Sequence, residues 1–314
     1  MSSLAPASFG AALSAAQDAA GAQHYPQATL YVVATPIGNL ADITLRALHV
    51  LQMVDAVACE DTRHTQGMLR AYGIDRPGAQ LLAVHQHNEA EAAQGVIARL
   101  AAGERIAYVS DAGTPGVSDP GARLAAAVRE AGHRVLPLPG ASSVTTLIGA
   151  AGLVAAGDES SAFVFAGFLP TKAGERDAAV QRLAVEPRSV VLLEAPHRVE
   201  ALARALAVLG ARRVTVGREL TKQFEEIATV TAHDLAAWFA AGKDRTRGEF
   251  ALVLHPAAVR ADDGAEADRV LRLLLAEVPL KTAVRLAADI SGGSKNVLYD
   301  TALRIRDDEK ARPD

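Results

Sequence analysis

Residues 105–121 read RIAYVSDAGTPGVSDPG, and this stretch decides the fold. An apolar run at 106–109 is followed by a loop with three glycines and two prolines, and a helical run begins at 122. Asp119 and Pro120 are suited to the N-cap and the first position of that helix. A buried strand that passes through a turn-rich loop into a helix is the repeating unit of an α/β sheet.

The same alternation of strand and helix continues on both sides of this unit. Strands are predicted at residues 29–34, 54–59, 80–84, 105–109 and 134–138, and again at 163–165, 189–193, 213–218, 226–231 and 249–255. Helices are predicted between them at 42–52, 62–72, 88–102, 174–184, 197–209 and 232–241. One helix separates the last two strands at short spacing, which indicates a mixed second sheet. The small and polar segment 152–161 marks the boundary between two domains.

Both ends of the chain differ from this pattern. Residues 1–28 are rich in Ala, Ser, Gly and Gln, and no basic residue precedes Arg46, so a disordered or loosely helical tail is predicted rather than a targeting peptide. A polar linker at 260–267 precedes helices predicted at 270–275, 282–288 and 297–305. Seven basic and three acidic residues lie between Arg269 and Arg306, so this small helical module, 268–306, is locally basic.

The composition excludes several classes of protein. The chain has 314 residues, half of them apolar, which is enough for two ordinary domains. Its net charge of −4 does not by itself predict a nucleic-acid partner. The only cysteine, Cys59, lies in an apolar run, which favours a small buried side chain over a nucleophile. One cysteine cannot form a disulfide framework, so a reducing cytoplasm is favoured. Uninterrupted apolar runs of 18 residues are absent, so we expect a soluble, cytoplasmic protein without a membrane span.

Three loops of the first half follow a strand and precede a helix. They are residues 35–40, 110–116 and 139–143. Because ligands of open α/β sheets bind beyond the carboxyl ends of the strands, these loops are expected to converge on one pocket. Residues 117–121 are expected only to begin the next helix. None of the loops has the phosphate-binding patterns of nucleotide folds or a basic side chain, and Asp111 adds negative charge, so a cationic or zwitterionic ligand is favoured.

Seven motifs in order identify a family resemblance. They are TPIGNLADI, CEDTRHT, SDAGTPGVSDPG, PGASS, EAPHR, RELTK and RGEF. Together they resemble the bacterial small-subunit ribosomal RNA cytidine 2′-O-methyltransferases, a family of the tetrapyrrole-methylase-like class of S-adenosylmethionine enzymes. The resemblance covers residues 29–256, and GGSKN at 292–296 is similar to part of the family's additional C-terminal module.

The resemblance implies an α/β fold with two domains of tetrapyrrole-methylase type, 29–152 and 160–257, and S-adenosylmethionine in the cleft between them. It also implies a homodimer that acts on small-subunit ribosomal RNA in an assembled or assembling subunit. The cofactor-binding residues it implies are Thr35, Pro36, Gly38, Asn39, Ser110, Asp111, Ala112, Gly113, Thr114, Pro115, Gly116, Pro139, Gly140 and Ser142. Because the first of these loops carries one glycine only, the role of Asn39 stays open.

Ribose methylation needs a positioned hydroxyl, and a base that takes up its proton assists the attack. The candidates for this role are Glu60, Asp61, Glu194 and Lys222, and the candidates for binding RNA are Arg63, His197, Arg198, Lys281 and Lys295. The alternating charges of residues 218–222 are a further RNA candidate. An equally good interpretation is that Glu60 and Asp61 stabilise a helix N-terminus. An alternative for Arg218 and Glu219 is an ion pair at the end of a strand.

Two further pairs of residues have simpler structural interpretations. His85 and His87 are spaced like a metal pair, but no further ligand accompanies them, so no metal is predicted. Trp238 and Phe239 are expected in a hydrophobic core. The alternative functions are methylation of a tetrapyrrole or a protein side chain on the same fold, and a non-catalytic RNA-binding factor in ribosome assembly.

Overall fold

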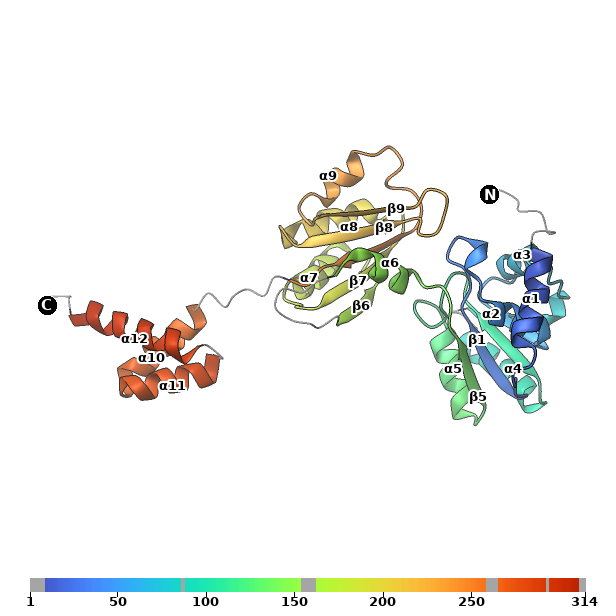
Figure 1. Ribbon diagram of the computed structural model, residues 1–314, viewed down its shortest axis with the longest axis horizontal. Coiled ribbons are helices and arrows are strands. Elements are labelled where there is room, and N and C mark those ends of the chain that lie inside the picture. The colour runs from blue at the N-terminus through green and yellow to red at the C-terminus, as the bar shows by residue number, and fades with distance from the viewer. Residues whose placement is uncertain (1–8, 86–87, 154–161, 258–264, 292–293, 311–314) are drawn as a thin grey trace.

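The computed structural model describes residues 9–85, 88–153, 162–257, 265–291 and 294–310. Two five-stranded sheets with helices packed on them are followed by a group of three helices (Figure 1). The α/β class predicted from the sequence is confirmed. Within the described ranges, no helix is long and apolar enough to cross a membrane.

The first sheet is parallel throughout, with strand order β3-β2-β4-β1-β5. Its strands are β1 (Thr29–Val33), β2 (Ala56–Cys59), β3 (Leu81–Ala83), β4 (Arg105–Val109) and β5 (Arg134–Leu138). Val33 is in register with Val109 on one side and Leu138 on the other. The three loops predicted to converge therefore leave three adjacent strands at the same edge of the sheet.

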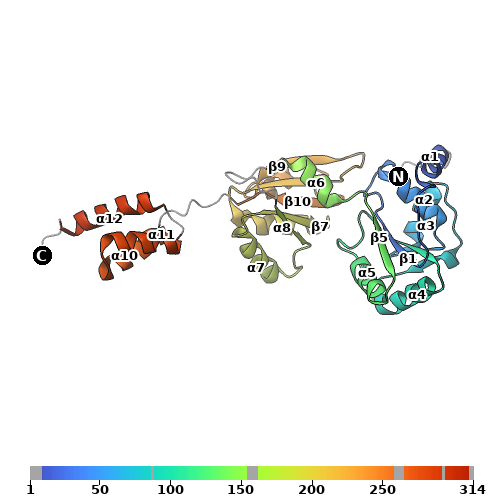
Figure 2. The same cartoon turned by 60° about the horizontal axis from the view of Figure 1, so that its bottom comes forward.

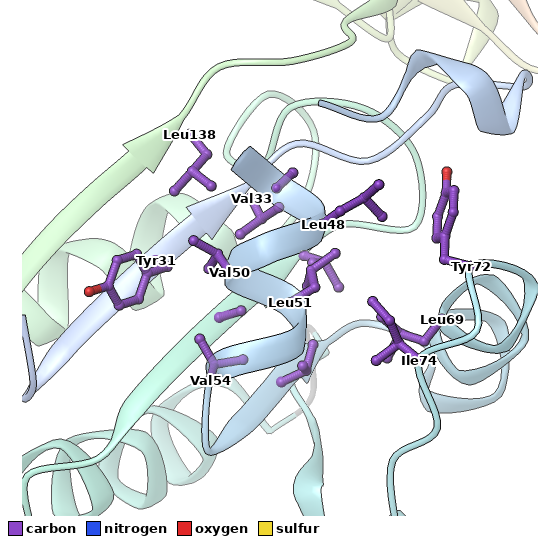
Figure 3. Close-up of a cluster of buried hydrophobic side chains, with 14 of the residues drawn as sticks. Tyr31, Val33, Leu48, Val50, Leu51, Val54, Leu69, Tyr72, Ile74 and Leu138 are labelled. Atoms are coloured by element: carbon purple, nitrogen blue, oxygen red, sulfur yellow. The ribbon is translucent and has the colours of Figure 1, made fainter. Parts of the chain in front are cut away.

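Both faces of the first sheet are covered, as expected for parallel strands. One face carries α2 (Leu45–Met53) and α3 (Thr62–Ala71), and the other carries α4 (Glu89–Ala101) and α5 (Gly121–Glu130). Figure 3 shows Leu48 and Leu51 of α2 directed into the cluster that contains Val33 and Leu138. Cys59 is fully buried, and burial raises the pKa of its thiol to about 11, so it is a core residue and not a thiolate nucleophile.

The tail was predicted to be disordered or loosely helical, and part of it forms helix α1 (Gly10–Ala20), which is not disordered or loose but packs against α2. Ala16 is completely buried, and the ring of Phe9 meets that of Tyr72 edge to face, with 5.0 Å between their centroids. The small side chains of the segment form one close-packed face. A composition rich in alanine does not distinguish a packed helix from a solvated tail. The segment is packed because α2 offers it an apolar surface, and the sequence of the segment does not contain that information.

The second sheet has strand order β6-β7-β10-β8-β9 and is mixed, as predicted. Only β6 (Phe163–Gly167) and β7 (Ser189–Glu194) run parallel, while β8 (Arg213–Arg218), β9 (Glu226–Thr231) and β10 (Phe250–Leu254) pair antiparallel. Helices α7 (Ala173–Ala184), α8 (Val199–Leu206) and α9 (Leu235–Ala240) contribute to the core on one face of this sheet. Phe239 is fully buried and Trp238 packs against the same core, as expected.

Helix α6 (Ser143–Ala151) covers the other face of the second sheet, although it follows directly after the last strand of the first (Figure 2). Val144 and Leu147 pack with Val191 of β7, Val253 of β10 and Ile37 of the first loop. In terms of packing, the division between the two sheets therefore lies before α6. The predicted boundary at 152–161 is too late, because the order of elements does not specify which sheet a helix covers.

The last three helices have a hydrophobic core of their own. They are α10 (Ala265–Glu277), α11 (Leu280–Ser291) and α12 (Lys295–Lys310), each longer than predicted. The core contains Leu271, Ala287 and Ala302, all fully buried and all within this group of helices. Lys281 and Lys295 lie on its surface, and the Nζ atom of Lys295 is 3.6 Å from Asp289 Oδ1.

Candidate active site

Hydrogen bonds join the three loops at the carboxyl edge of the first sheet. The N–H of Thr35 donates to Gly113 O at 3.0 Å, and the N–H of Gly113 donates to Thr35 O at 3.1 Å. The Thr35 hydroxyl also donates to Ser110 O. The Thr114 hydroxyl donates to Ala141 O at 2.9 Å, which connects the central loop to the third. These bonds hold the loops in one preorganised surface.

A fourth segment, which follows β2, joins the central loop from its other side. The N–H of Asp61 donates to Asp111 Oδ1 at 3.2 Å, and the N–H of Asp111 donates to Glu60 Oε1 at 3.4 Å. This contact follows from the strand order, because β2 and β4 are neighbours. Glu60 is thereby placed beside the loop that was predicted to bind a ligand.

Asp119 holds the far end of the central loop. Its carboxylate accepts hydrogen bonds from the N–H groups of Gly116 and Gly121, at 2.6 and 2.8 Å, and from the hydroxyl of Tyr108 at 3.0 Å. A Cβ atom at Gly121 would overlap the ring of Tyr108, so the first residue of α5 has to be glycine. The expected helix start is therefore confirmed to within one residue, with Asp119 bound to the first turn.

These segments enclose a cavity of about 110 Å³. It is lined by Glu60, Ser110, Ala112, Gly113, Thr114, Val117, Ser118, Asp119, Ser142, Ser143 and, from the second sheet, Leu193. Five of the residues predicted to bind the cofactor are among them. The prediction that residues 117–121 serve the helix alone is wrong, because three of them line the cavity. Ser118 and Asp119 were polar residues of the quoted stretch, whereas nothing in the sequence pointed to Leu193.

The cavity is electrostatically negative. Burial raises the pKa of Glu60 above its ordinary value, and the charges of Asp111 and Asp119 add to this rise while the Asp111 N–H opposes it. Among the described residues that line the cavity, none is a lysine, arginine or histidine. A cationic group that enters the cavity is attracted by uncompensated carboxylates, whereas a phosphate is repelled.

Close backbone packing explains two glycines of these loops. Gly113 has a φ of +87°, and a Cβ atom there would lie 3.0 Å from Ile37 Cγ2. At Gly140, a Cβ atom would lie 2.8 Å from the Cβ of Ala34. Side chains at either position would separate the loops that close the cavity.

Comparisons with known proteins identify the family of this chain. Residues 29–236 match the family model of tetrapyrrole (corrin/porphyrin) methylases, and residues 261–306 match that of the RsmI C-terminal HTH domain. Ribosomal RNA small subunit methyltransferase I from Escherichia coli O157:H7 is 47% identical over 280 residues, which cover 88% of this chain and 95% of that protein. The chain belongs to the ribosomal RNA small subunit methyltransferase I family. The family member from Pseudomonas aeruginosa is also 47% identical, with 88% and 97% of the two chains covered.

Solved structures place the fold of this methyltransferase among the tetrapyrrole methylases. Cobalt precorrin-4 methyltransferase superposes with a TM-score of 0.51 at 19% identity, over 72% of this chain and 94% of that chain. Uroporphyrin-III-C-methyltransferase from Thermus thermophilus gives a TM-score of 0.51 at 22% identity, over 74% and 96%. At such identities the likeness concerns the fold alone.

In this methyltransferase the first loop also contacts the second sheet. The N–H of Asn39 donates to Thr221 Oγ1 at 3.1 Å, and Asn39 Oδ1 accepts from the N–H of Ala41 at the start of a 3-10 turn, η2 (Leu40–Asp42). A Cβ atom at Gly38 would overlap the side chain of Lys222. Asn39 thus joins the first loop to the turn after β8 through its backbone N–H.

Lys222 is poorly suited to act as a base in this methyltransferase. Its Nζ atom donates to Glu219 Oε1 at 2.8 Å and to Glu249 Oε2 at 3.1 Å. Burial lowers the pKa of Lys222, but the bonds to the two carboxylates outweigh burial and raise it overall. The ammonium group therefore keeps its proton and lies beside the first loop as a fixed positive charge.

Asp61 is a helix cap. Its Oδ1 atom accepts from the N–H groups of Arg63 and His64, at 2.8 and 3.3 Å, and these bonds lower its pKa. The structural interpretation of this aspartate is thereby supported over the catalytic one. The side chain of Arg63 is 92% exposed, and its Nε atom lies 3.7 Å from Asp61 Oδ1.

Glu194 and Arg198 form a buried pair, with 3.1 Å between Glu194 Oε1 and Arg198 Nε and only 1% of the glutamate side chain exposed. Arg198 also donates to Leu169 O. Successive strand residues point to opposite faces, so Leu193 lines the cavity while Glu194 points away from it. The roles predicted for Glu194 in catalysis and for Arg198 in RNA binding do not fit this geometry. His197 is exposed in the turn before α8, which begins two residues later than predicted.

The described residues contain no group of three or more histidine, cysteine, aspartate or glutamate side chains arranged to hold a metal ion. His85 lies in the loop after β3, and Asn88 Oδ1 accepts from its N–H at 2.8 Å. His87 falls outside the described residues.

Proposed function

We propose that this protein transfers the methyl group of S-adenosylmethionine to the 2′-oxygen of a cytidine ribose in small-subunit ribosomal RNA. The observation that carries the proposal is the negatively charged cavity at the loops of the first sheet. These loops belong to the region that matches the tetrapyrrole methylases, and the chain is 47% identical to a protein named ribosomal RNA small subunit methyltransferase I. The cytidine and the 2′-oxygen rest on the family resemblance of the seven motifs.

The residues around the cavity suit S-adenosylmethionine, which carries a positive sulfonium and supplies an already activated methyl group when bound. Glu60 and Asp119 provide negative charge, and the backbone of residues 110–116 provides polar groups held in place by the loop bonds. At about 110 Å³ the cavity is smaller than the roughly 300 Å³ at which pockets for drug-sized ligands begin. It therefore holds one part of the cofactor, and the rest of the binding site lies outside it.

Glu60 is the residue we assign as proton acceptor for the ribose hydroxyl. Of the four candidates it alone lines the cavity, since Asp61 caps a helix, Glu194 points to the opposite face of its sheet, and Lys222 keeps its proton. A raised pKa makes a carboxylate a better base near neutral pH, because the proton taken up is held more firmly. Asp111 positions Glu60 through its N–H.

We propose three functional parts: a first α/β domain that begins at residue 29, carries the cofactor loops and ends before α6, a second α/β domain that begins with α6 and ends at residue 257, and the module at 268–306 that binds RNA. The exposed Lys281 and Lys295 of the module, together with Arg63, are suited to contacts with phosphates.

We further propose a homodimer in the cytoplasm, as the family resemblance implies. Light scattering of the purified protein measures the mass, and a monomer would contradict the homodimer.

The proposed function is tested by incubating the protein with labelled S-adenosylmethionine and under-methylated small ribosomal subunits, and then mapping the modified ribose. We expect one labelled cytidine 2′-oxygen, and no label in subunits from cells that already carry the modification. Label on a base, or none in any RNA, contradicts the proposal. Deletion of residues 267–314 should abolish RNA methylation, whereas an enzyme for tetrapyrroles would keep its activity.

A further inference from the structure

A second cavity, of about 410 Å³, lies on the second sheet and is separate from the cofactor loops. Its lining residues are Arg218, Glu219, Phe224, Asp244, Arg247 and Gly248. Two segments form its walls: residues 219–225, which connect β8 to β9, and residues 242–248, which connect α9 to β10. We call it the Phe224 pocket. Its volume lies within the range of about 300–1,000 Å³ that is typical of small-ligand sites.

Hydrogen bonds hold the two walls of the Phe224 pocket together. The mostly buried guanidinium of Arg218 donates to Arg247 O at 3.3 Å on one wall and to Phe224 O at 3.2 Å on the other. The N–H of Glu249 donates to Glu219 Oε1 at 2.9 Å, and the N–H of Glu219 donates to Glu249 O at 3.0 Å. The pocket is therefore preformed, which lowers the entropy lost when a ligand binds.

The backbone of the first wall is strained. Glu219 and Thr221 have φ values of 51° and 66°, in the left-handed region that is unfavourable for residues other than glycine. On the opposite wall Gly248 has a φ of +90°, and a Cβ atom there would lie 2.5 Å from Glu219 Cδ. Strained residues persist where surrounding contacts hold them, and they cluster at binding sites. Here the hydrogen bonds between Glu219 and Glu249 hold the strained wall in place.

The side chains that face the Phe224 pocket suit a nucleotide. Phe224 is 69% exposed, and an exposed aromatic ring offers a stacking surface for a base. The Arg247 side chain is 77% exposed and pairs with Asp244 at 3.0 Å, a solvent-exposed pair that a phosphate can replace. The carboxylates of Asp244 and Glu219 are acceptors that suit the N–H groups at the edge of a base.

The pocket is connected to the cofactor loops through Lys222. Glu219 lines the pocket and accepts a hydrogen bond from Lys222 Nζ, and the aliphatic part of Lys222 packs against Gly38 of the first loop. Thr221 of the same wall accepts the hydrogen bond from Asn39. A ligand in the pocket is thus bound by the same segment that contacts the first loop. A substrate is expected to bind at such a position, next to the proposed cofactor site.

We propose that the Phe224 pocket binds an unpaired nucleotide of the RNA substrate, with its base stacked on Phe224 and its phosphate on Arg247. The proposal rests on the proposed function, because it assumes that the substrate is RNA. Proteins that recognise unpaired RNA combine these features, an aromatic platform, a cation for the backbone, and acceptors for the edge of the base.

The test uses the full-length protein with under-methylated small subunits and labelled S-adenosylmethionine. We expect Phe224→Ala and Arg247→Ala each to raise the KM for subunits about 5- to 100-fold, with cofactor affinity by calorimetry unchanged. Phe224→Tyr keeps the ring and should restore the wild-type KM. Matched controls are the exposed Phe168→Ala, after β6, and Arg204→Ala, whose ion pair with Glu200 on α8 is also exposed. Both controls should keep the wild-type KM.

The results separate this proposal from the proposed function. If the wild-type protein methylates subunits but Phe224→Ala has an unchanged KM, the pocket is not an RNA site. A KM that rises equally for Phe224→Tyr contradicts stacking, and an equal rise in the two controls contradicts a specific pocket. If the wild-type protein methylates no RNA, the proposed function fails, and a test with a labelled single-stranded RNA fragment then applies to the pocket alone. Equal affinity of that fragment for wild type and Phe224→Ala overturns it.

Discussion

The N–H of Asn39 donates a hydrogen bond of 3.1 Å to the hydroxyl of Thr221, a residue 182 positions further along the chain. One partner belongs to the first loop, residues 35–40, and the other to the strained turn after β8. Lys222, the next residue, packs against Gly38. These contacts therefore join the first loop to the wall of the Phe224 pocket.

Replacement of Gly38 by alanine should disturb this contact. The added Cβ atom would overlap Lys222 and displace it from Glu219 and Glu249. We expect a loss of about 1–3 kcal/mol in the free energy of unfolding, as for other overpacked sites, together with weaker cofactor binding. Chemical denaturation and calorimetry measure the two effects. Gly67→Ala, in the middle of α3 with free space around it, is the control and should be neutral or stabilising. Equal stability of the two variants would contradict the packing argument.

Gly113→Ala tests the central loop against a matched glycine elsewhere. Gly113 and Gly103 have φ values of +87° and +90°, but a Cβ atom meets Ile37 and the third loop only at Gly113, and has free space at Gly103. Both variants should lose about 1–2 kcal/mol of stability from backbone strain. Calorimetry with S-adenosylmethionine should show weaker binding for Gly113→Ala alone. Unchanged affinity would remove this loop from the cofactor site.

Glu60→Gln should lower kcat for RNA methylation by about 10²- to 10⁴-fold, the usual contribution of a general base. The amide keeps an acceptor for the Asp111 N–H, so the loop geometry is retained. Steady-state kinetics with saturating cofactor provide the measurement. Glu200→Gln, on the exposed surface of α8, serves as the control and should behave as wild type. A kcat within about twofold of wild type for Glu60→Gln would show that Glu60 is not the proton acceptor.

The same substitution has a pH-dependent effect on stability. Below the ordinary pKa of 4.5, the Glu60 carboxyl is protonated in both the folded and unfolded states. As the pH rises above 4.5, the carboxyl ionises first in the unfolded state. The folded state therefore loses stability until the pH has passed the raised pKa of Glu60 in the folded protein. Glu60→Gln removes this loss. We expect its melting temperature relative to wild type to increase from about pH 4 to about pH 8. A difference that does not depend on pH would contradict the raised pKa.

Helix α1 allows a comparison between neighbouring residues. Ala16 is completely buried against the core, whereas Ala15 is exposed. Ala16→Asp should reduce the free energy of unfolding by about 2 kcal/mol or more, because it buries an unpaired charge. Ala15→Asp should change it by less than about 0.5 kcal/mol. Thermal denaturation of the two variants measures the difference, and identical melting curves would mean that the segment does not pack as described.

Local patterns were sufficient for most of the elements. All ten strands were predicted, and β4, β5, β8 and β9 have the predicted bounds, because buried runs of β-branched residues between turn signals are a local property. The convergence of the three loops could also be predicted, because the carboxyl ends of parallel strands share an edge. Five predicted residues line the cavity. The sequence alone could not show which candidate is the proton acceptor. Glu60, Asp61, Glu194 and Lys222 are all polar residues beside a strand or helix, and their sequence positions do not differ in a way that selects one.

The sequence by itself determined the alternation of strands and helices and the family, and it predicted that the loop at 110–116 belongs to a ligand site. The tertiary structure decided which candidates face the cavity. It placed Glu60 beside the central loop, turned Glu194 to the opposite face of its strand, and seated α6 on the second sheet and α1 on the first. These outcomes depend on contacts between residues far apart in the chain. Periodicity and composition describe neighbours along the chain, whereas burial, pKa and orientation are set by neighbours in space.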